Sequence, residues 1–153
     1  MERFKFQLEN SGISAKYTLK PDFSWACLNV DRIVNKYSGK KLILILPFCS
    51  PQLRHKKWPH YNELIQKIKS KYQNKFKIII APGSLEIKNA KEIDADCILD
   101  NGKALDISQL SSLIKDSSFV IANDTGPAHM AAHINVKGLT LFGSHTTAVK
   151  VSI

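Results

Sequence analysis

The feature that most constrains the fold is an alternation of short, largely apolar runs with segments of helical periodicity, which begins near residue 41. Such runs are too short to span a bilayer and are typical of strands buried on both faces of a sheet. They occupy residues 42–46, 76–81, 97–99, 119–122 and 138–142. Because helices lie between the strands, the sequence predicts an α/β fold: a three-layer parallel sheet with right-handed crossovers.

Four segments between the strands carry apolar residues at helical spacing. Helices are therefore predicted over about residues 59–72, 85–92, 106–114 and 127–133. Pro59 and Pro127 suit the first helical position, and Asp106 suits an N-cap. Ligands of such sheets bind outside the carboxyl ends of the strands. The loops expected to carry function are thus 47–57, 82–86, 101–106 and 123–127.

Residues 1–40 lack this alternation, so we expect them to form a linker or covering helical segment beside a domain of residues 41–153. One short helix ends near Gly12, and a second is predicted from about Ser24 to Tyr37, stopped by Gly39. The first residues contain no signal-peptide block, which favours a cytoplasmic protein.

The net charge of +9 is concentrated in the first half: residues 1–77 carry +11 and residues 78–153 carry −2. A basic face attracts nucleic acid, anionic lipid or nucleotide phosphates, although a solvated lysine-rich surface gives the same pattern. No helix combines arginines with aromatic residues, so nucleic acid is not an expected partner. The cysteines Cys27, Cys49 and Cys97 lack CxxC spacing, which argues against a disulfide framework and a zinc site.

The loop at residues 123–129 is the most informative one. Pro127 at the first helical position makes Gly126 the predicted N-cap, and glycine has no side chain to bind the free amides of the first turn. Those amides and the helix dipole can bind a phosphate, with Thr125 and His129 nearby. Alternatively, Asp124 or Thr125 caps the helix and His129 is a surface residue. Local chemistry leaves both interpretations open.

Two further loops offer polar groups at the same sheet edge. Ser50 and Lys56 follow the first strand, where lysine is a suitable partner for a pyrophosphate, although basic loops are common. Glu86 follows the second strand and could accept the hydroxyls of a ribose, or could simply stabilise a first helical turn. The sequence contains neither GxGxxG nor GxxxxGK[ST], which disfavours a dinucleotide domain and a P-loop.

Together, these loops resemble glycosyltransferase family 9, the lipopolysaccharide heptosyltransferases, over about residues 41–150. Leu46-Pro-Phe-Cys-Ser-Pro with His55-Lys-Lys-Trp-Pro59 is similar to the family segment PGxSP…HKRWP. Asn123-Asp-Thr-Gly-Pro-Ala-His-Met-Ala-Ala132, followed by Leu139-Thr-Leu-Phe-Gly143, is similar to NDTGxxHLAA…LFG. The resemblance implies the C-terminal half of a GT-B fold, Rossmann-like, which binds a nucleotide-sugar donor, usually ADP-heptose, without a metal or another cofactor.

The resemblance also implies roles for individual residues. Residues implied to line the phosphate site are Ser50, Lys56, Thr125, Gly126 and His129. Glu86 would hold the ribose, Asp124 would contact the donor or shape the turn, and residues 101–106 would hold the base, largely by backbone contacts. Positive charge at the phosphates would stabilise the leaving nucleoside diphosphate.

The family's N-terminal half, which carries the acceptor site and the catalytic base, has no counterpart in this sequence, so the general base is not expected in this chain. We therefore expect a donor domain that transfers a sugar to a lipid-linked lipopolysaccharide acceptor with a separate N-terminal-half chain, in peripheral contact with the inner membrane. The alternative is an inactive remnant or a stand-alone nucleotide-binding module.

Overall fold

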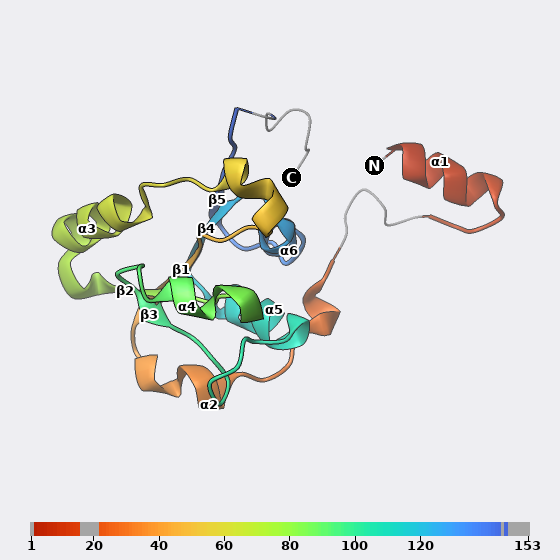
Figure 1. Cartoon of the computed structure of the whole chain (residues 1–153). Coiled ribbons are helices and arrows are strands. Elements are labelled where there is room, and N and C mark those ends of the chain that lie inside the picture. The colour runs from red at the N-terminus through yellow and green to blue at the C-terminus, as the bar shows by residue number, and fades with distance from the viewer. Residues whose placement is uncertain (1, 16–21, 145, 147–153) are drawn as a thin grey trace.

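The computed structural model describes residues 2–15, 22–144 and 146. Its centre is a parallel sheet of five strands in the order β3-β2-β1-β4-β5 (Figure 1). The strands are β1 (Lys41–Leu46), β2 (Phe76–Ile80), β3 (Asp96–Cys97), β4 (Phe119–Asn123) and β5 (Gly138–Leu141). Leu44 of β1 lies beside Ile79 of β2 on one side and Val120 of β4 on the other. The predicted α/β fold is confirmed.

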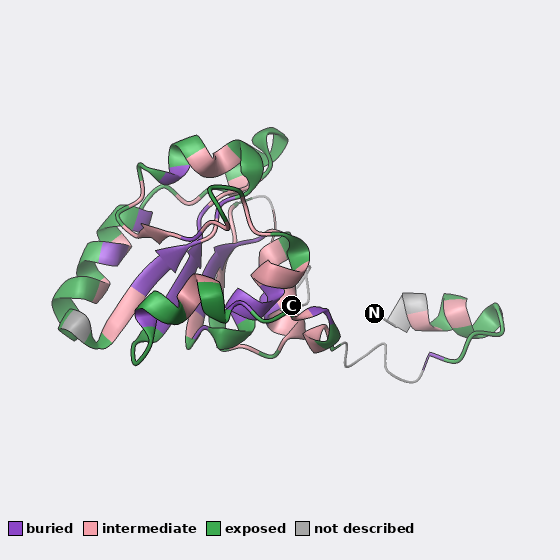
Figure 2. Ribbon diagram, turned by 90° about the horizontal axis from the view of Figure 1, so that it is seen from below, coloured by how far each residue is buried: buried purple, intermediate pink, exposed green. Residues whose placement is uncertain are grey.

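Helices cover both faces of the sheet, and the strands between them are largely buried (Figure 2). Successive residues of β1 point to opposite faces, as the twofold period of a strand requires. Leu42, Leu44 and Leu46 pack in a cluster with α5 and α6, whereas Ile43 and Ile45 pack in a second cluster with α3. The α-helices are α1 (Glu2–Asn10), α2 (Asp31–Val34), α3 (Tyr61–Tyr72), α4 (Ile87–Ala90), α5 (Ile107–Asp116) and α6 (Gly126–His133).

Short 3₁₀ turns join several of these elements. They are η1 (Ser24–Ala26), η2 (Asn35–Tyr37), η3 (Pro51–Lys56), η4 (Gln73–Lys75) and η5 (Ser84–Glu86). The prediction of Asp106 as an N-cap is confirmed, because its carboxylate accepts the Gln109 amide at 2.8 Å. The prediction of Pro59 as the first residue of α3 is wrong: that helix begins at Tyr61, with His60 as its N-cap.

The continuous helix predicted from Ser24 to Tyr37 is also wrong, because the segment forms η1, α2 and η2 with a break between η1 and α2. The Asn29 side chain accepts the backbone N–H of Asp31 at 2.8 Å, a local bond that competes with the helical one. Trp25 and Leu28, two of the apolar residues that suggested the helix, are 79% and 58% exposed. The segment that follows still packs on the sheet through Tyr37.

Neither hydrophobic cluster contains a described residue of α1, although Ala15, Ala26 and Val30 before α2 are also buried. Within the described part of the chain, no helix has the length and apolar character needed to cross a membrane.

The strand order decides where a ligand can bind. From β1 the chain runs outward through β2 and β3, then returns to β4 on the opposite side. The carboxyl ends of β1 and β4 therefore form a topological switch point, where open α/β sheets bind ligands.

Candidate functional site

A cavity of about 410 Å³ lies at this switch point. The loops after β1, β2 and β4 form its walls, and Leu105 and Leu110 close it on the side of α5. All seven predicted site residues line it: Ser50, Lys56, Glu86, Asp124, Thr125, Gly126 and His129. Residues more than seventy positions apart in the chain thus share one cavity, as the loop prediction requires. The roles of the individual residues stay predictions.

The start of α6 forms the floor of the phosphate site predicted from the sequence. Thr125, with φ −145°, is the N-cap, and Gly126 is the first helical residue. The prediction that Gly126 is the N-cap is therefore wrong by one position, because Pro127 takes the second helical position, where its missing N–H also costs nothing. The Thr125 hydroxyl donates to the Asn123 carbonyl at 3.3 Å and makes no capping hydrogen bond to the first turn. Thr125, one of the two residues named in the alternative interpretation, is therefore the N-cap by position, although its side chain makes no capping bond.

Lys56 reaches the same turn from η3. Its Nζ donates to Asp124 Oδ2 at 2.8 Å and to the Asp124 carbonyl at 3.2 Å. The Asp124 side chain is 5% exposed and that of Lys56 is 19% exposed, so the ion pair is largely shielded from water. His129 Nε2 lies 3.8 Å from Asp124 Oδ1. Asp124 thus compensates the charge of Lys56, a pairing that the sequence did not predict.

Asn123, the last residue of β4, is completely buried and holds the two principal loops together. Its Oδ1 accepts the Trp58 backbone N–H at 3.1 Å and the Tyr61 hydroxyl at 2.9 Å. Its Nδ2 donates to the Pro47 carbonyl at 2.9 Å. Burial raises the pKa of the Tyr61 phenol, which keeps it a proton donor to Asn123. Asn123 therefore fixes the segment that carries Lys56 beside Asp124.

Sequence reasoning did not single out Asn123, although one signal was present: a polar residue directly after four strand residues, at the start of the informative loop. Trp58 anchors the start of α3. Its ring contacts Tyr61 edge to face, with centroids 5.2 Å apart, and packs against the cluster below α3.

Glu86 lies at the far wall of the cavity, in η5. Its Oε2 accepts the Gly83 backbone N–H at 2.8 Å, while the Glu86 amide donates to the Gly83 carbonyl at 2.9 Å. The carboxylate therefore stabilises its own turn, as one of the two interpretations of the sequence expected. The described bond uses only Oε2, so the observed geometry is compatible with a second contact through Oε1.

Cys49 is a lining residue that the sequence did not identify. It is partly exposed, as are Cys27 and Cys97, rather than a fully buried thiol. Its Sγ donates to the Leu53 carbonyl at 3.2 Å. Desolvation, followed by the negative charge of Glu86, raises the pKa of the Cys49 thiol, so the group is neutral near pH 7.

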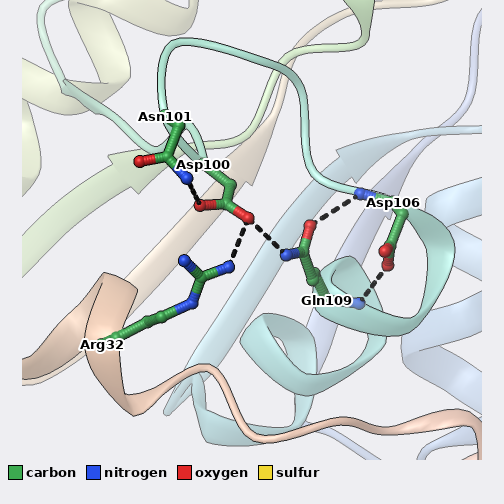
Figure 3. A network of polar contacts seen from close by, with 5 residues as sticks. All are labelled: Arg32, Asp100, Asn101, Asp106 and Gln109. Atoms are coloured by element: carbon green, nitrogen blue, oxygen red, sulfur yellow. Dashed lines mark hydrogen bonds and ion pairs between the residues drawn. The ribbon is translucent and has the colours of Figure 1, made fainter.

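The loop before α5, which is predicted to hold the base of the nucleotide, is anchored by a polar network (Figure 3). Asp100 accepts from Arg32 at 2.6 Å and from Gln109 at 2.7 Å. Gln109 in turn exchanges hydrogen bonds with Asp106 at the start of α5. The network ties α2 to this loop across the end of β3, so the position of Leu105 in the cavity wall is fixed from both sides.

The profile of glycosyltransferase family 9 (heptosyltransferase) matches residues 5–150. The chain belongs to this family. The match extends over most of the first 40 residues, beyond the range of about 41–150 that the motifs predict. The chain matches no curated protein at a significant level.

Solved heptosyltransferases have the same fold. Heptosyltransferase WaaC of E. coli, solved with ADP, superposes with a TM-score of 0.70 at 18% identity, covering 95% of this chain and 46% of that one. ADP-heptose lps heptosyltransferase II of E. coli gives 0.62 at 20% identity, covering 78% and 40%. A family 9 glycosyltransferase of Veillonella parvula gives 0.56 at 17% identity, covering 76% and 35%. The chain thus spans less than half the length of these relatives and has the Rossmann-like fold of one part of them.

Among the described residues, no group of three or more His, Cys, Asp or Glu side chains is arranged to hold a metal ion. The polar groups that the cavity presents are instead an uncapped helix start, an ammonium group, an imidazole and two carboxylates. This combination suits an anionic ligand that makes several hydrogen bonds.

Proposed function

We propose that this chain is the donor-binding part of a heptosyltransferase-type glycosyltransferase. It binds a nucleoside diphosphate sugar, ADP-heptose or a close analogue, in the cavity at the switch point. The sugar is destined for the saccharide of a lipid-linked lipopolysaccharide acceptor. The observation that carries the proposal is the juxtaposition of the uncapped start of α6 with Lys56 in one cavity.

Lys56 can bind a phosphate oxygen without leaving Asp124. A lysine ammonium has three N–H donors. Two of them point to Asp124 Oδ2 and to the Asp124 carbonyl. The third is available to a ligand, and Asp124 holds the ammonium in the orientation that presents it. In this arrangement Asp124 is a positioning residue for Lys56.

The proposed chemical role of the site is to stabilise the leaving group. In an inverting transfer the acceptor hydroxyl attacks the anomeric carbon, the bond from that carbon to the diphosphate breaks, and the nucleoside diphosphate departs with additional negative charge. The amide of Gly126, the dipole of α6 and Lys56 stabilise that charge more strongly in the transition state than in the ground state. Removing one such donor typically slows the chemical step by about 10²–10³. In this proposal protein cations supply the positive charge, with no metal and no other cofactor.

The general base is proposed to come from elsewhere. The two carboxylates that line the cavity, Glu86 and Asp124, are engaged with Gly83 and Lys56 respectively. Neither is placed as a free base toward an acceptor. This observation also favours a second candidate function: a nucleotide-binding module without transferase activity of its own.

The proposed location is the cytoplasm, in peripheral contact with the inner membrane, where an N-terminal-half chain would supply the acceptor site.

Thermal unfolding in the presence of nucleotides tests donor binding. ADP and ADP-heptose at 100 times their Kd should stabilise the chain by about 2.7 kcal/mol, and GDP and UDP by less. A Gly126→Asp variant is the matched control, because a carboxylate at the first helical residue would repel phosphates. If millimolar ADP, GDP and UDP all leave the melting temperature of the unmodified chain unchanged, donor binding is wrong.

Turnover assays separate the two functions. With ADP-heptose and a lipid A–Kdo acceptor, the chain alone should form no product, and addition of an N-terminal-half chain should restore activity. Product formed by the chain alone would contradict the assignment of the base to another segment. Nucleotide binding without product under either condition would favour the stand-alone module.

A further inference from the structure

The turn that follows Asp100 in the polar network of Figure 3 contains a chemically labile pair of residues. The sequence has a single Asn-Gly pair, Asn101-Gly102, just before the segment that supplies Leu105 to the cavity wall. Asp100 and Lys103 exchange two backbone hydrogen bonds, each 2.9 Å long, so Asn101 and Gly102 are the two central residues of a tight turn. Both residues are exposed, and their φ values are positive, 49° and 78°.

The structure leaves the reacting groups of this pair accessible. Asparagine is a thermolabile residue, because the backbone nitrogen of the next residue can attack its side-chain carbonyl carbon. A side chain on that next residue hinders the attack, and Gly102 has none. The Gly102 N–H makes no hydrogen bond to any described residue, and a Cβ added at Gly102 would meet no atom within 4 Å. Attack requires this exposed turn to open and the Asn101 side chain to leave Asp100 Oδ1, to which its Nδ2 donates at 3.0 Å.

We propose that Asn101 is a site of spontaneous deamidation, and that the product weakens this wall of the cavity. The Gly102 nitrogen forms a bond to Cγ of Asn101, the bond from Cγ to Nδ2 breaks, and Nδ2 leaves as ammonia with the proton of the Gly102 amide. Water then opens the resulting succinimide ring. Opening at Cγ gives aspartate, and opening at the backbone carbonyl carbon of Asn101 gives isoaspartate, in which the main chain runs through Cβ and Cγ. Water is the one co-reactant, and no atom is oxidised or reduced.

Either product replaces a hydrogen-bond donor of the network with a carboxylate. Asn101 Nδ2 lies 3.0 Å from Asp100 Oδ1, so the new carboxylate faces an existing one, and the two like charges repel each other. Asp100 is also the residue that binds Arg32 and Gln109 and thereby ties the loop to α2 and α5 (Figure 3). Isoaspartate in addition lengthens the main chain inside a two-residue turn, which disrupts the paired backbone bonds that close it. Deamidation therefore loosens the loop that positions Leu105 in the cavity wall.

Peptide mass spectrometry of the full chain tests the modification itself. The chain is incubated for several days at pH 7.5 and at pH 9, and conversion of the amide to a carboxylate is measured at each asparagine. Asn135 is the matched internal control, because it is also exposed and has a positive φ, 61°, but is followed by Val136. Asn101 should convert to a mixture of aspartate and isoaspartate, faster at pH 9 because attack requires loss of the Gly102 amide proton, and Asn135 should stay unchanged. Equal conversion of both asparagines, or no conversion of Asn101 at either pH, would overturn the proposal.

An Asn101→Asp variant, which mimics one product, tests the consequence; its effect on ADP binding rests on the proposed function. Hydrogen exchange of the Asp100 and Lys103 amides, whose bonds close the turn, should accelerate in this variant. ADP should bind about fivefold more weakly, the equivalent of one lost hydrogen bond. Asn135→Asp adds the same charge at a matched position that does not line the cavity and should change neither quantity.

Equal effects of the two variants, or unchanged exchange in Asn101→Asp, would refute the link between Asn101 and the cavity wall. Failure of ADP to bind the unmodified chain would refute the donor site alone. The exchange and mass measurements would still decide the inference about Asn101, because neither requires a nucleotide.

Discussion

Removal of the Lys56 ammonium gives the sharpest test of the site, because the residue has two separable roles. A Lys56→Met variant keeps most of the side-chain volume and leaves the Asp124 carboxylate, 5% exposed, without its cation. Breaking a buried ion pair by removing one partner costs about 3–5 kcal/mol. Lys56 is itself 19% exposed, so we expect the lower end, about 3 kcal/mol. For a chain of this length each kcal/mol lowers the melting temperature by about 2–4 °C.

A Lys56→Met/Asp124→Asn double variant separates structure from binding. The neutral amide removes the carboxylate charge that has lost its ammonium partner, so stability should return to within about 1 kcal/mol of the unmodified chain. Affinity for ADP should stay low in both variants. The loss of a hydrogen bond to a charged group is worth about 1.5–3 kcal/mol, which corresponds to roughly 10- to 150-fold weaker binding.

Urea unfolding followed by circular dichroism measures the stabilities, and titration calorimetry with ADP measures the affinities. If the double variant is as unstable as the single one, the ion pair is not the origin of the loss. If the double variant binds ADP as tightly as the unmodified chain, Lys56 does not contact the phosphates, and the proposed leaving-group site is wrong.

Three other predictions test the packing, the cavity and a helix cap. A Cβ at Gly138 would lie 2.8 Å from a backbone carbonyl of β4, so Gly138→Ala should cost about 1–3 kcal/mol of stability in urea unfolding. A Cβ at Gly126 would meet nothing within 4 Å, so Gly126→Ala should preserve stability while weakening ADP binding. Equal stability losses would contradict this. Burial raises the pKa of the Cys49 thiol, so iodoacetamide should modify Cys49 slowly at pH 7.5 and faster as the pH rises above 9. Peptide mass spectrometry should show that ADP protects Cys49, which lines the cavity, and not Cys97. Protection of both cysteines would point to a global effect. Asp106→Ala removes the N-cap of α5 and should cost about 1 kcal/mol in the same unfolding assay, so an unchanged midpoint would refute the role of that cap.

The sequence predicted the fold more completely than the site. The apolar run of β1 and the spacing of Leu64, Ile65 and Ile68 predicted a buried strand and a helix, because both signals arise from residues that are neighbours in the chain. Asp106 was identified as a cap for the same reason. The helix expected from Ser24 to Tyr37 failed where the Asn29 side chain offers the backbone a competing bond, which periodicity does not register.

At the site, the sequence predicted which loops meet, since the carboxyl ends of parallel strands share one edge. It did not predict which side chains bind one another. Lys56 was expected to be free for a ligand and is instead held by Asp124. Asn123 was overlooked although it joins the two loops through three hydrogen bonds.

By itself, then, the sequence determined the α/β class, the number of strands and the loops at the functional edge, because hydrophobic periodicity and turn chemistry are local. It did not determine burial, since β3 is only partly buried and β5 is partly exposed. Only the tertiary structure decided that Lys56 and Asp124, which lie 68 positions apart, form a shielded ion pair beside an open helix start. The reason is the strand order: β4 returns to the side of β1 opposite β2, and that crossover alone brings the two loops into contact.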